Sequence, residues 1–341
     1  MNWKNKTIST VTLCSIMLLS SGYAASPQIL PTQAQTKSAT TSNSPLPKIT
    51  KSLFNSDKRN ILANQELLKI TDTHKSTANL TKTLPDLANK SSVALTTPQQ
   101  LASEETMALL WMRTAAEYRA LCYQAYNTAL SHIDTAIRNK KPNQRPLAII
   151  LDCDETVVSN NNALSQSAAN HNGQFSAHWW HDYIGKGSSQ ALPGASQFLN
   201  DVHNKGVAIF YVTNRYAPDN TEATLKNLRH LGFPDVNKEQ VLLMTTTGNK
   251  QPRFDAVAKN YDIILYMGDN YGDFPLPKAT SINSRATVID KTQTDWGTKY
   301  IIFPNPVYGS WVSAISQKYL TLTPQERDFV NKKLLTTNPF L

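Results

Sequence analysis

The pattern of apolar and polar positions becomes regular from about residue 97 onward. Thr97 stands as a helix N-cap, Pro98 follows at the first helical position, and Gln100 stands at the third. Apolar residues then recur at helical spacing over residues 107–137, until Lys140, Lys141 and Pro142 end the pattern. This stretch predicts a long amphipathic helix that packs on a core.

Strands and helices alternate after residue 145. The predicted strands are 147–151, 207–212, 241–244, 263–267, 287–289 and 300–303, and the predicted helices are 194–203, 221–231 and 253–260. Such alternation predicts an α/β fold, a Rossmann-like three-layer sandwich with a mostly parallel sheet. About fifty residues rich in Asn, His and Trp separate the first two strands. We interpret this segment, at about residues 160–206, as a small, mainly helical cap insert.

The N-terminus has the pattern of a secretory signal. Lys4 and Lys6 precede an apolar run at residues 11–19, and Gly22 and Ala24 fit a cleavage site. The run is too short to span a bilayer, so we predict no transmembrane span. Residues 1–24 are therefore predicted to be a signal peptide, and the protein to be exported, either periplasmic or secreted.

Composition divides the rest of the chain. Residues 25–95 are rich in Ser, Thr, Asn, Gln, Lys and Pro, which predicts a low-complexity, disordered spacer. One folded α/β domain, which includes the insert, is predicted over 96–320, followed by a C-terminal extension at 321–341. The net charge is +9, but most of it lies in the first 90 residues, so no basic groove for a nucleic-acid polymer is predicted.

Export permits a disulfide between Cys122 and Cys153, but two thiols do not require one.

Two carboxylates follow the first predicted strand. Asp152 and Asp154 come directly after Leu151, and alternation along a strand points both side chains to one side. Strand residues two positions apart lie roughly 6.5–7 Å apart, a spacing that suits one phosphoryl group and one metal ion. Ligands of open parallel sheets bind at these carboxyl ends. Taken alone, the pattern also fits a turn with a helix cap.

Later strand ends carry polar groups suited to phosphate chemistry. They are Thr213, Asn214 and Arg215 after the second strand, Lys250 after the third, and Asp269 and Asp273 after the fourth. A hydroxyl and a backbone N–H at Thr213 can hold a phosphoryl oxygen, and we predict that Asn214 and Arg215 bind substrate. Lys250, with Arg253 as the second choice, can neutralise phosphate. Carboxylates are ligands that Mg²⁺ prefers.

These motifs resemble a known family. Asp152-x-Asp154-Glu155-Thr156 and Gly268-Asp269-Asn270-x-x-Asp273-Phe274 are similar to the two signatures of the class C bacterial acid phosphatases. That family belongs to the four-aspartate phosphatase group of the haloacid dehalogenase superfamily. The resemblance extends over about residues 97–315.

The resemblance implies a mechanism. Asp152 would attack phosphorus to form an aspartyl-phosphate, and Asp154 would serve as acid and then as base. Thr213 and Lys250 would bind phosphoryl oxygens. Mg²⁺ would be held by Asp152, the backbone carbonyl of Asp154 and two later carboxylates, Asp269 and Asp273, the last of these directly or through water.

The implied activity is an exported, Mg²⁺-dependent acid phosphatase acting on phosphomonoesters, with 5′-nucleotidase activity. Trp179, Trp180 and Tyr308 can stack a nucleotide base, or they can simply pack the cap. Two alternatives stay open: a phosphotransferase using the same intermediate, and a non-catalytic surface or storage protein on the same fold. The sequence also leaves open whether the protein forms a homodimer.

Overall fold

The computed structural model describes residues 96–170 and 177–337. The predicted signal peptide and spacer lie outside the described residues. The central sheet consists of five strands in the order β5-β4-β1-β6-β7, and every neighbouring pair is parallel. The strands are β1 (Leu147–Leu151), β4 (Ala208–Tyr216), β5 (Val241–Met244), β6 (Asp262–Gly268) and β7 (Tyr300–Ile302). The predicted α/β class and parallel sheet are confirmed.

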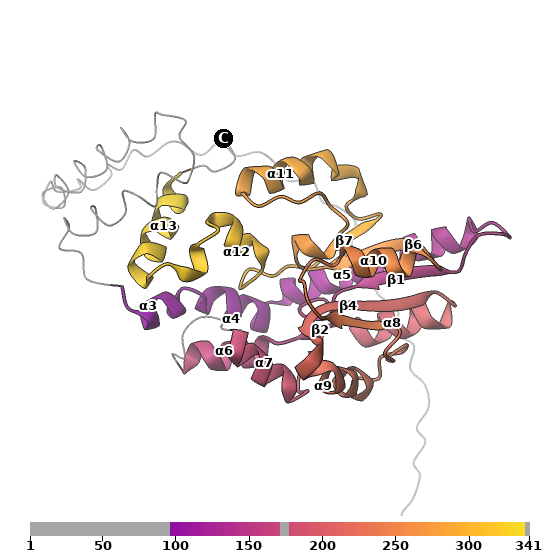
Figure 1. Cartoon of the computed structure of the whole chain (residues 1–341), viewed down its shortest axis with the longest axis horizontal. Coiled ribbons are helices and arrows are strands. Elements are labelled where there is room, and N and C mark those ends of the chain that lie inside the picture. Colours follow the sequence, from indigo (N-terminus) through magenta and orange to yellow (C-terminus); the bar gives the residue numbers. More distant parts are fainter. Residues whose placement is uncertain (1–95, 171–176, 338–341) are drawn as a thin grey trace, which may run out of the picture. The chain divides into compact units, whose positions relative to one another are not determined.

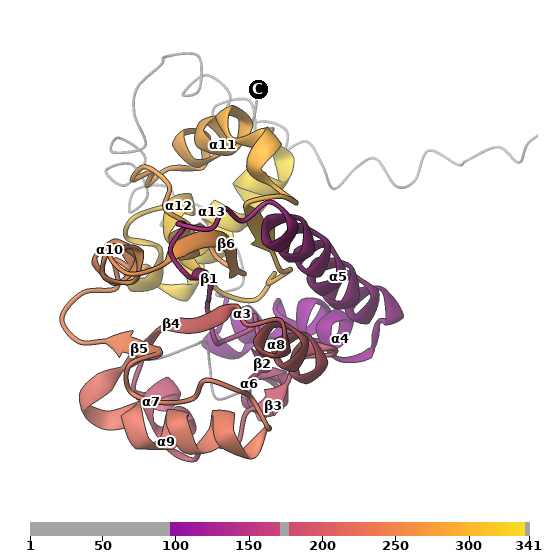
Figure 2. The same ribbon diagram turned by 90° about the vertical axis from the view of Figure 1, so that its right-hand side faces the viewer.

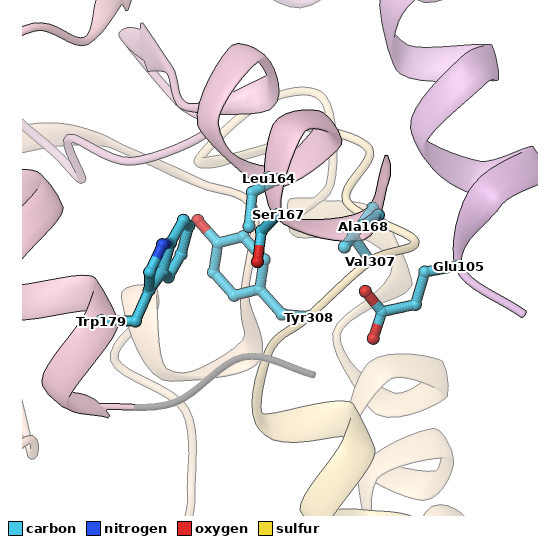
Figure 3. Close-up of a pocket in the computed structure, with 7 residues that line it drawn as sticks. All are labelled: Glu105, Leu164, Ser167, Ala168, Trp179, Val307 and Tyr308. Atoms are coloured by element: carbon cyan, nitrogen blue, oxygen red, sulfur yellow. The ribbon is translucent and has the colours of Figure 1, made fainter. Parts of the chain in front are cut away.

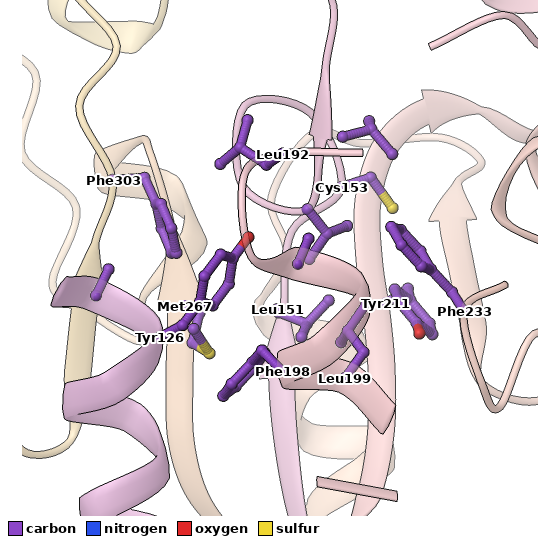
Figure 4. Close-up of a cluster of buried hydrophobic side chains, with 14 of the residues drawn as sticks. Tyr126, Leu151, Cys153, Leu192, Phe198, Leu199, Tyr211, Phe233, Met267 and Phe303 are labelled. Carbon is purple, nitrogen blue, oxygen red and sulfur yellow. The ribbon is translucent and has the colours of Figure 1, made fainter. Parts of the chain in front are cut away.

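Helices cover both faces of the sheet (Figures 1 and 2). On one face lie α5 (Ala116–Arg138) and α8 (Ala195–Asn204), and on the other lies α10 (Gln251–Ala258). Residues of β1 alternate between two cores, because successive strand side chains point to opposite faces. Leu147, Ile149 and Leu151 belong to the larger core (Figure 4), while Ala148 and Ile150 belong to the smaller core beside α10. This strand is buried on both sides, as expected for a central parallel strand.

The segment between β1 and β4 forms several short elements. It contains β2 (Val158–Ser159), α6 (Asn161–Ala169), α7 (Ala177–Gly185) and β3 (Gln190–Ala191) before α8 begins. β2 and β3 pair antiparallel as a separate two-stranded sheet. α6 packs against α4 (Thr106–Thr114), and α7 packs against α9 (Ala217–His230). α8 packs on the sheet itself beside α5, so it belongs to the helical layer.

The long predicted helix is divided into three helices. The first turn forms as predicted: α3 (Pro98–Ser103) has Thr97 as its cap, with the Thr97 and Gln100 side chains each accepting the other's backbone N–H. α4 (Thr106–Thr114) and α5 are then separated by Ala115, whose backbone is extended. The break lets α4 bury Leu109 and Met112 beside α6 while α5 follows the sheet.

The predicted strand at 287–289 is wrong. These residues lie in α11 (Ile282–Lys291), which Ser281 caps by accepting the backbone N–H of Ser284. A triplet of β-branched residues is too short to outweigh a capped helix. The strand predicted at 300–303 is observed as β7, which takes the last position in the sheet beside β6.

The C-terminal part carries α12 (Ser310–Ile315) and α13 (Pro324–Thr336), and α13 packs against α3. Short 3₁₀ helices occur at Tyr271–Asp273, Gln293–Asp295 and Tyr319–Thr321. Cys122 and Cys153 are both free thiols inside the core. Within the described ranges, no helix has both the length and the apolar character needed to cross a membrane.

Gly194 caps α8 in a left-handed conformation, with a φ of 90°. A Cβ there would lie 2.9 Å from the Tyr123 ring and 3.1 Å from the Tyr126 ring. We expect Gly194→Ala to lower the free energy of unfolding by about 2–3 kcal/mol, because overpacking adds to backbone strain. Gly206 is the control, because its φ is 73° but a Cβ there would meet nothing within 4 Å. Gly206→Ala should cost about 1 kcal/mol. Urea unfolding followed by circular dichroism measures both, and equal losses would contradict the packing argument.

Candidate active site

The chain turns sharply where β1 ends. The Asp152 N–H still donates to the carbonyl of Met267 on β6, at 3.0 Å, so the strand pairing extends to this residue. The carbonyl of Cys153 then accepts the N–H groups of Val157 and Val158, both at 2.9 Å. Glu155 between them has a φ of 53°, an uncommon value for a residue with a side chain. The turn places the polar side chains of this segment at the carboxyl edge of the sheet.

Lys250 is the cation at the centre of the site. It precedes α10 and is 3% exposed. Its Nζ lies 2.6 Å from Asp152 Oδ1 and 2.7 Å from Asp273 Oδ1. Burial alone would lower the pKa of Lys250, but the two carboxylates outweigh burial and raise it. Lys250 is therefore a permanently charged bridge between the loops that follow β1 and β6.

Gly268 lets the second acidic loop come close. It is the last residue of β6, and a Cβ on it would lie 2.2 Å from the Cβ of Asp273. The Oδ2 of Asp273 accepts the N–H of Asn270 at 2.9 Å, which closes the loop. Asp269 accepts hydrogen bonds from Thr156 Oγ1 at 3.2 Å and Asn305 Nδ2 at 2.9 Å. Only a glycine at position 268 leaves room for the side chain of Asp273.

Three carboxylates can share one metal ion. Asp152, Asp269 and Asp273 each offer an oxygen, and these oxygens lie within 4.8 Å of one another. Burial raises the pKa of Asp152 to about 7, although Lys250 opposes the shift. Burial, followed by the charge of Asp273, raises the pKa of Asp269 well above its ordinary value. One ammonium does not offset three buried carboxylates, so the donor set fits a hard divalent cation.

Asp154 has a different partner. Arg215 donates from Nη2 to Asp154 Oδ1 at 2.7 Å and from Nε to Oδ2 at 3.0 Å. Asn160 adds a bond from Nδ2 to Asp154 Oδ1 at 2.9 Å. The Arg215 side chain is 1% exposed. Burial lowers the pKa of Arg215, but the charge of Asp154 outweighs burial and raises it. Arg215, predicted to bind substrate, thus faces Asp154.

Thr213 and Asn214, predicted to follow the second strand, lie within β4 and differ in exposure. Thr213 is fully buried, and its Oγ1 accepts the N–H of Arg215 at 3.2 Å. Asn214 is exposed and donates to the carbonyl of Gly248 at 2.9 Å. Arg253, the second choice for a phosphate-binding cation, donates to Asn214 Oδ1 and to the carbonyl of Thr213. Lys250 rather than Arg253 therefore contacts the acidic cluster.

The predicted aromatic residues gather beside the site. The ring centroids of Trp180 and Tyr308 are 5.7 Å apart, and Trp179 stacks on Tyr183 at 5.7 Å. Figure 3 shows Trp179 and Tyr308 side by side in the wall of a small cavity that also contacts Glu105. The Tyr308 hydroxyl donates to Glu155 Oε2. These aromatics therefore adjoin the turn that carries the acidic pair.

Three polar residues of the site had no assigned role from sequence: Glu155, Asn160 and Asn305. Glu155 lies within a motif that marked the family resemblance, but nothing in the spacing of Glu155 or Asn305 indicates their partners. Asn160 carries no sequence signal. Glu155 contacts the distant Tyr308, and Asn305 contacts the distant Asp269, which local pattern does not reveal. Asn160 contacts its near neighbours Asp154 and Glu155 and also the more distant Ser189.

Comparison with known proteins gives two kinds of match. A family model described as HAD superfamily, subfamily IIIB (acid phosphatase), matches residues 66–311. Among solved structures, the class C acid phosphatase from Bacillus anthracis is 35% identical, with a TM-score of 0.66, and the match covers 70% of this chain and 98% of that one. The crystal structure of the class C acid phosphatase from the same organism with tungstate bound is 34% identical, with a TM-score of 0.65 and the same coverage.

The Arg215–Asp154 pair generates a stability prediction. Arg215→Met leaves the Asp154 carboxylate buried without its charged partner, which should cost about 3–5 kcal/mol of unfolding free energy. Arg145, whose side chain is 51% exposed, pairs with Asp262 at 2.6 Å and serves as the control. Arg145→Met should cost less than about 1 kcal/mol. Urea unfolding compares the two, and a loss for Arg215→Met no larger than the control would show that the buried pair contributes little.

Proposed function

Because the chain belongs to the acid phosphatases of HAD superfamily subfamily IIIB, and is thus a phosphoric monoester hydrolase, we propose that it hydrolyses nucleoside 5′-monophosphates with Mg²⁺ through an aspartyl-phosphate. One observation carries this proposal: Lys250 bridges Asp152 and Asp273, while Asp269 completes the acidic cluster. This arrangement supports the assignment of a nucleophile, a phosphate-binding cation and a metal-binding set to one buried edge of the sheet.

In the first half-reaction, Asp152 attacks phosphorus and the P–O bond to the alcohol breaks. Asp154 gives its proton to the departing oxygen. In the second half-reaction, Asp154 removes a proton from water, which attacks the aspartyl-phosphate and releases phosphate and the Asp152 carboxylate. Arg215 and Asn160 fix the orientation of Asp154 throughout.

The phosphoryl oxygens would be held by Lys250 and by the hydroxyl and N–H of Thr213. Mg²⁺ would be held by carboxylates of Asp152, Asp269 and Asp273 and by the backbone carbonyl of Asp154. The metal supplies positive charge that offsets the repulsion between carboxylates and a dianionic ester. Tungstate, bound in the Bacillus anthracis relative, is a tetrahedral oxyanion like phosphate, which supports an oxyanion site in this fold.

The leaving group would lie against the aromatic residues. Trp180 and Tyr308 are half-buried neighbours of the acidic turn, and bases stack on such rings with about 1–3 kcal/mol each. This proximity supports a nucleotide substrate. Lys4, Lys6 and the apolar run at residues 11–19 support export to the periplasm or the medium.

The nucleophile can be tested directly. Asp152→Asn should abolish turnover of AMP with Mg²⁺ and remove the hydroxylamine-sensitive phosphoprotein found after acid quenching, because an amide does not form the acyl phosphate. Asp255→Asn is the control, since Asp255 is an exposed residue of α10. Circular dichroism should show both variants folded. Retained turnover in Asp152→Asn would refute the assigned nucleophile.

Metal binding should appear in thermal stability. Mg²⁺ at about a hundred times its Kd should add about 2.7 kcal/mol to the stability of the folded state and raise Tm by several degrees. Asp269→Asn should abolish that rise, whereas Asp255→Asn should keep it. A full Mg²⁺ response in Asp269→Asn would exclude Asp269 as a ligand.

The stability of the metal-free protein should depend on pH. Burial raises the folded-state pKa of Asp152 to about 7 from 3.8, and raises that of Asp269 in the same direction. The folded state therefore binds these protons more tightly than the unfolded state, so stability falls as pH rises from about 4 through 7. The Mg²⁺-induced rise in Tm should grow over the same range, as measured by differential scanning fluorimetry. A metal-free Tm that rises between pH 5 and 7 would contradict this sign.

A further inference from the structure

Tyr308 is held at both its backbone and its hydroxyl. Asn305 Oδ1 accepts the N–H groups of Val307 at 3.1 Å and Tyr308 at 3.3 Å, while its Nδ2 donates to Asp269. At the far end of the ring, the Tyr308 hydroxyl donates to Glu155 Oε2. The ring thus spans from the loop that follows β7 to the turn that follows β1.

Glu155 is itself fixed. It is fully buried and accepts the N–H of Asn160 at 2.7 Å and the Asn160 Nδ2 at 3.1 Å. Asn160 also contacts Asp154, and its Oδ1 accepts the Ser189 hydroxyl at 2.6 Å. No ion pair joins Glu155 to a basic side chain in the described part of the chain. Hydrogen bonds therefore offset the cost of burying this carboxyl group, and the loss of any one donor is costly.

The position of the Tyr308 ring determines the shape of the aromatic wall. Its centroid lies 5.7 Å from that of Trp180, with 57° between the ring planes. Loss of the hydroxyl contact removes one restraint on the side-chain torsions of Tyr308, so stacking on a ligand ring then costs more entropy of ordering. A ring held in advance binds an aromatic leaving group more tightly, whereas a ligand without a ring gains little.

We propose that Glu155 is a positioning residue that fixes the Tyr308 ring through its hydroxyl and thereby sets the preference for phosphomonoesters with a ring-bearing leaving group. This inference rests on the proposed phosphatase site and on stacking at Tyr308. It assigns Glu155 no contact with the reacting atoms. Asn305 supports the same ring from its backbone side.

A purely structural role for Glu155 makes a different prediction. Glu155 also contacts Asn160, which holds Asp154, so damage to the turn would slow the hydrolysis of every ester alike. Loss of the Tyr308 contact would instead weaken the binding of ring-bearing esters. The ratio of kcat/KM for AMP to kcat/KM for glycerol 3-phosphate separates the two roles.

The test measures this ratio with Mg²⁺ in the wild type, Tyr308→Phe, Glu155→Gln and the double variant. Each single variant should lower the ratio about three- to tenfold, the effect of one hydrogen bond, mainly through a higher KM for AMP. The double variant should fall no further than Tyr308→Phe, because that change already removes the contact that Glu155→Gln weakens by replacing a carboxylate with an amide. Tyr319→Phe is the control, since its hydroxyl donates to Asn331 near the C-terminus. It should keep the wild-type ratio.

Several outcomes would overturn the inference. An unchanged ratio in Tyr308→Phe would do so even if Glu155→Gln failed to fold. Equal losses on both esters in Glu155→Gln, or additive losses in the double variant, would assign Glu155 a structural role. A wild-type ratio near one would contradict nucleotide preference itself, and an inactive wild type would contradict the proposed function. Failure of the inference alone would look different: the wild type would prefer AMP, and the variants would keep that preference.

Discussion

The site depends on compensating negative charge at the carboxyl edge of a buried sheet. β1 and β6 are neighbours, so the loops that follow them deliver Asp152, Asp269 and Asp273 to one place. Like charges at this distance repel one another and destabilise the fold unless a cation offsets them. Lys250 supplies one such charge from the start of α10, on the smaller core's side of the sheet. The contact of Lys250 with Asp152 and Asp273 depends on the strand order, on the position of α10 and on the glycine at residue 268.

The two carboxylates that follow β1 differ in their partners. Asp152 faces the ammonium of Lys250, which forms single contacts and leaves the other oxygens of the cluster available. Asp154 faces the planar guanidinium of Arg215, which contacts both of its oxygens and restricts its rotation. Two acids two residues apart are thereby suited to separate roles, one in forming a bond to phosphorus and one in moving protons. Arg215 lies in β4, next to β1, whereas Lys250 stands between the edge strand β5 and α10.

The pattern of apolar and polar residues predicted most of the strands and helices of the fold. The bounds of β1 and β5 were predicted as observed, because each is a short apolar run between turn residues. The strand at 287–289 was predicted wrongly because its β-branched triplet lies inside a capped helix. Lys250 was predicted from its place after a strand, and it contacts the acidic cluster. The partner of Arg215 was not foreseen, since β4 continues beyond Val212 and turns that side chain inward. Contacts such as Tyr308 with Glu155 join segments some 150 residues apart, and no local pattern encodes them.

The loops that follow β6 and β7 are joined at two points. Asn305 donates to Asp269, and Ser310 donates to Asn270 from its N–H at 3.0 Å and its hydroxyl at 2.6 Å. The aromatic residue that would meet the leaving group and the carboxylate that would meet the metal therefore belong to one connected unit. A substitution that moves Asn305 or the backbone of Tyr308 would therefore also disturb a hydrogen bond that Asp269 accepts. Leaving-group recognition and metal binding are coupled at this point of the fold, so a new substrate preference gained at Tyr308 would change the metal site as well.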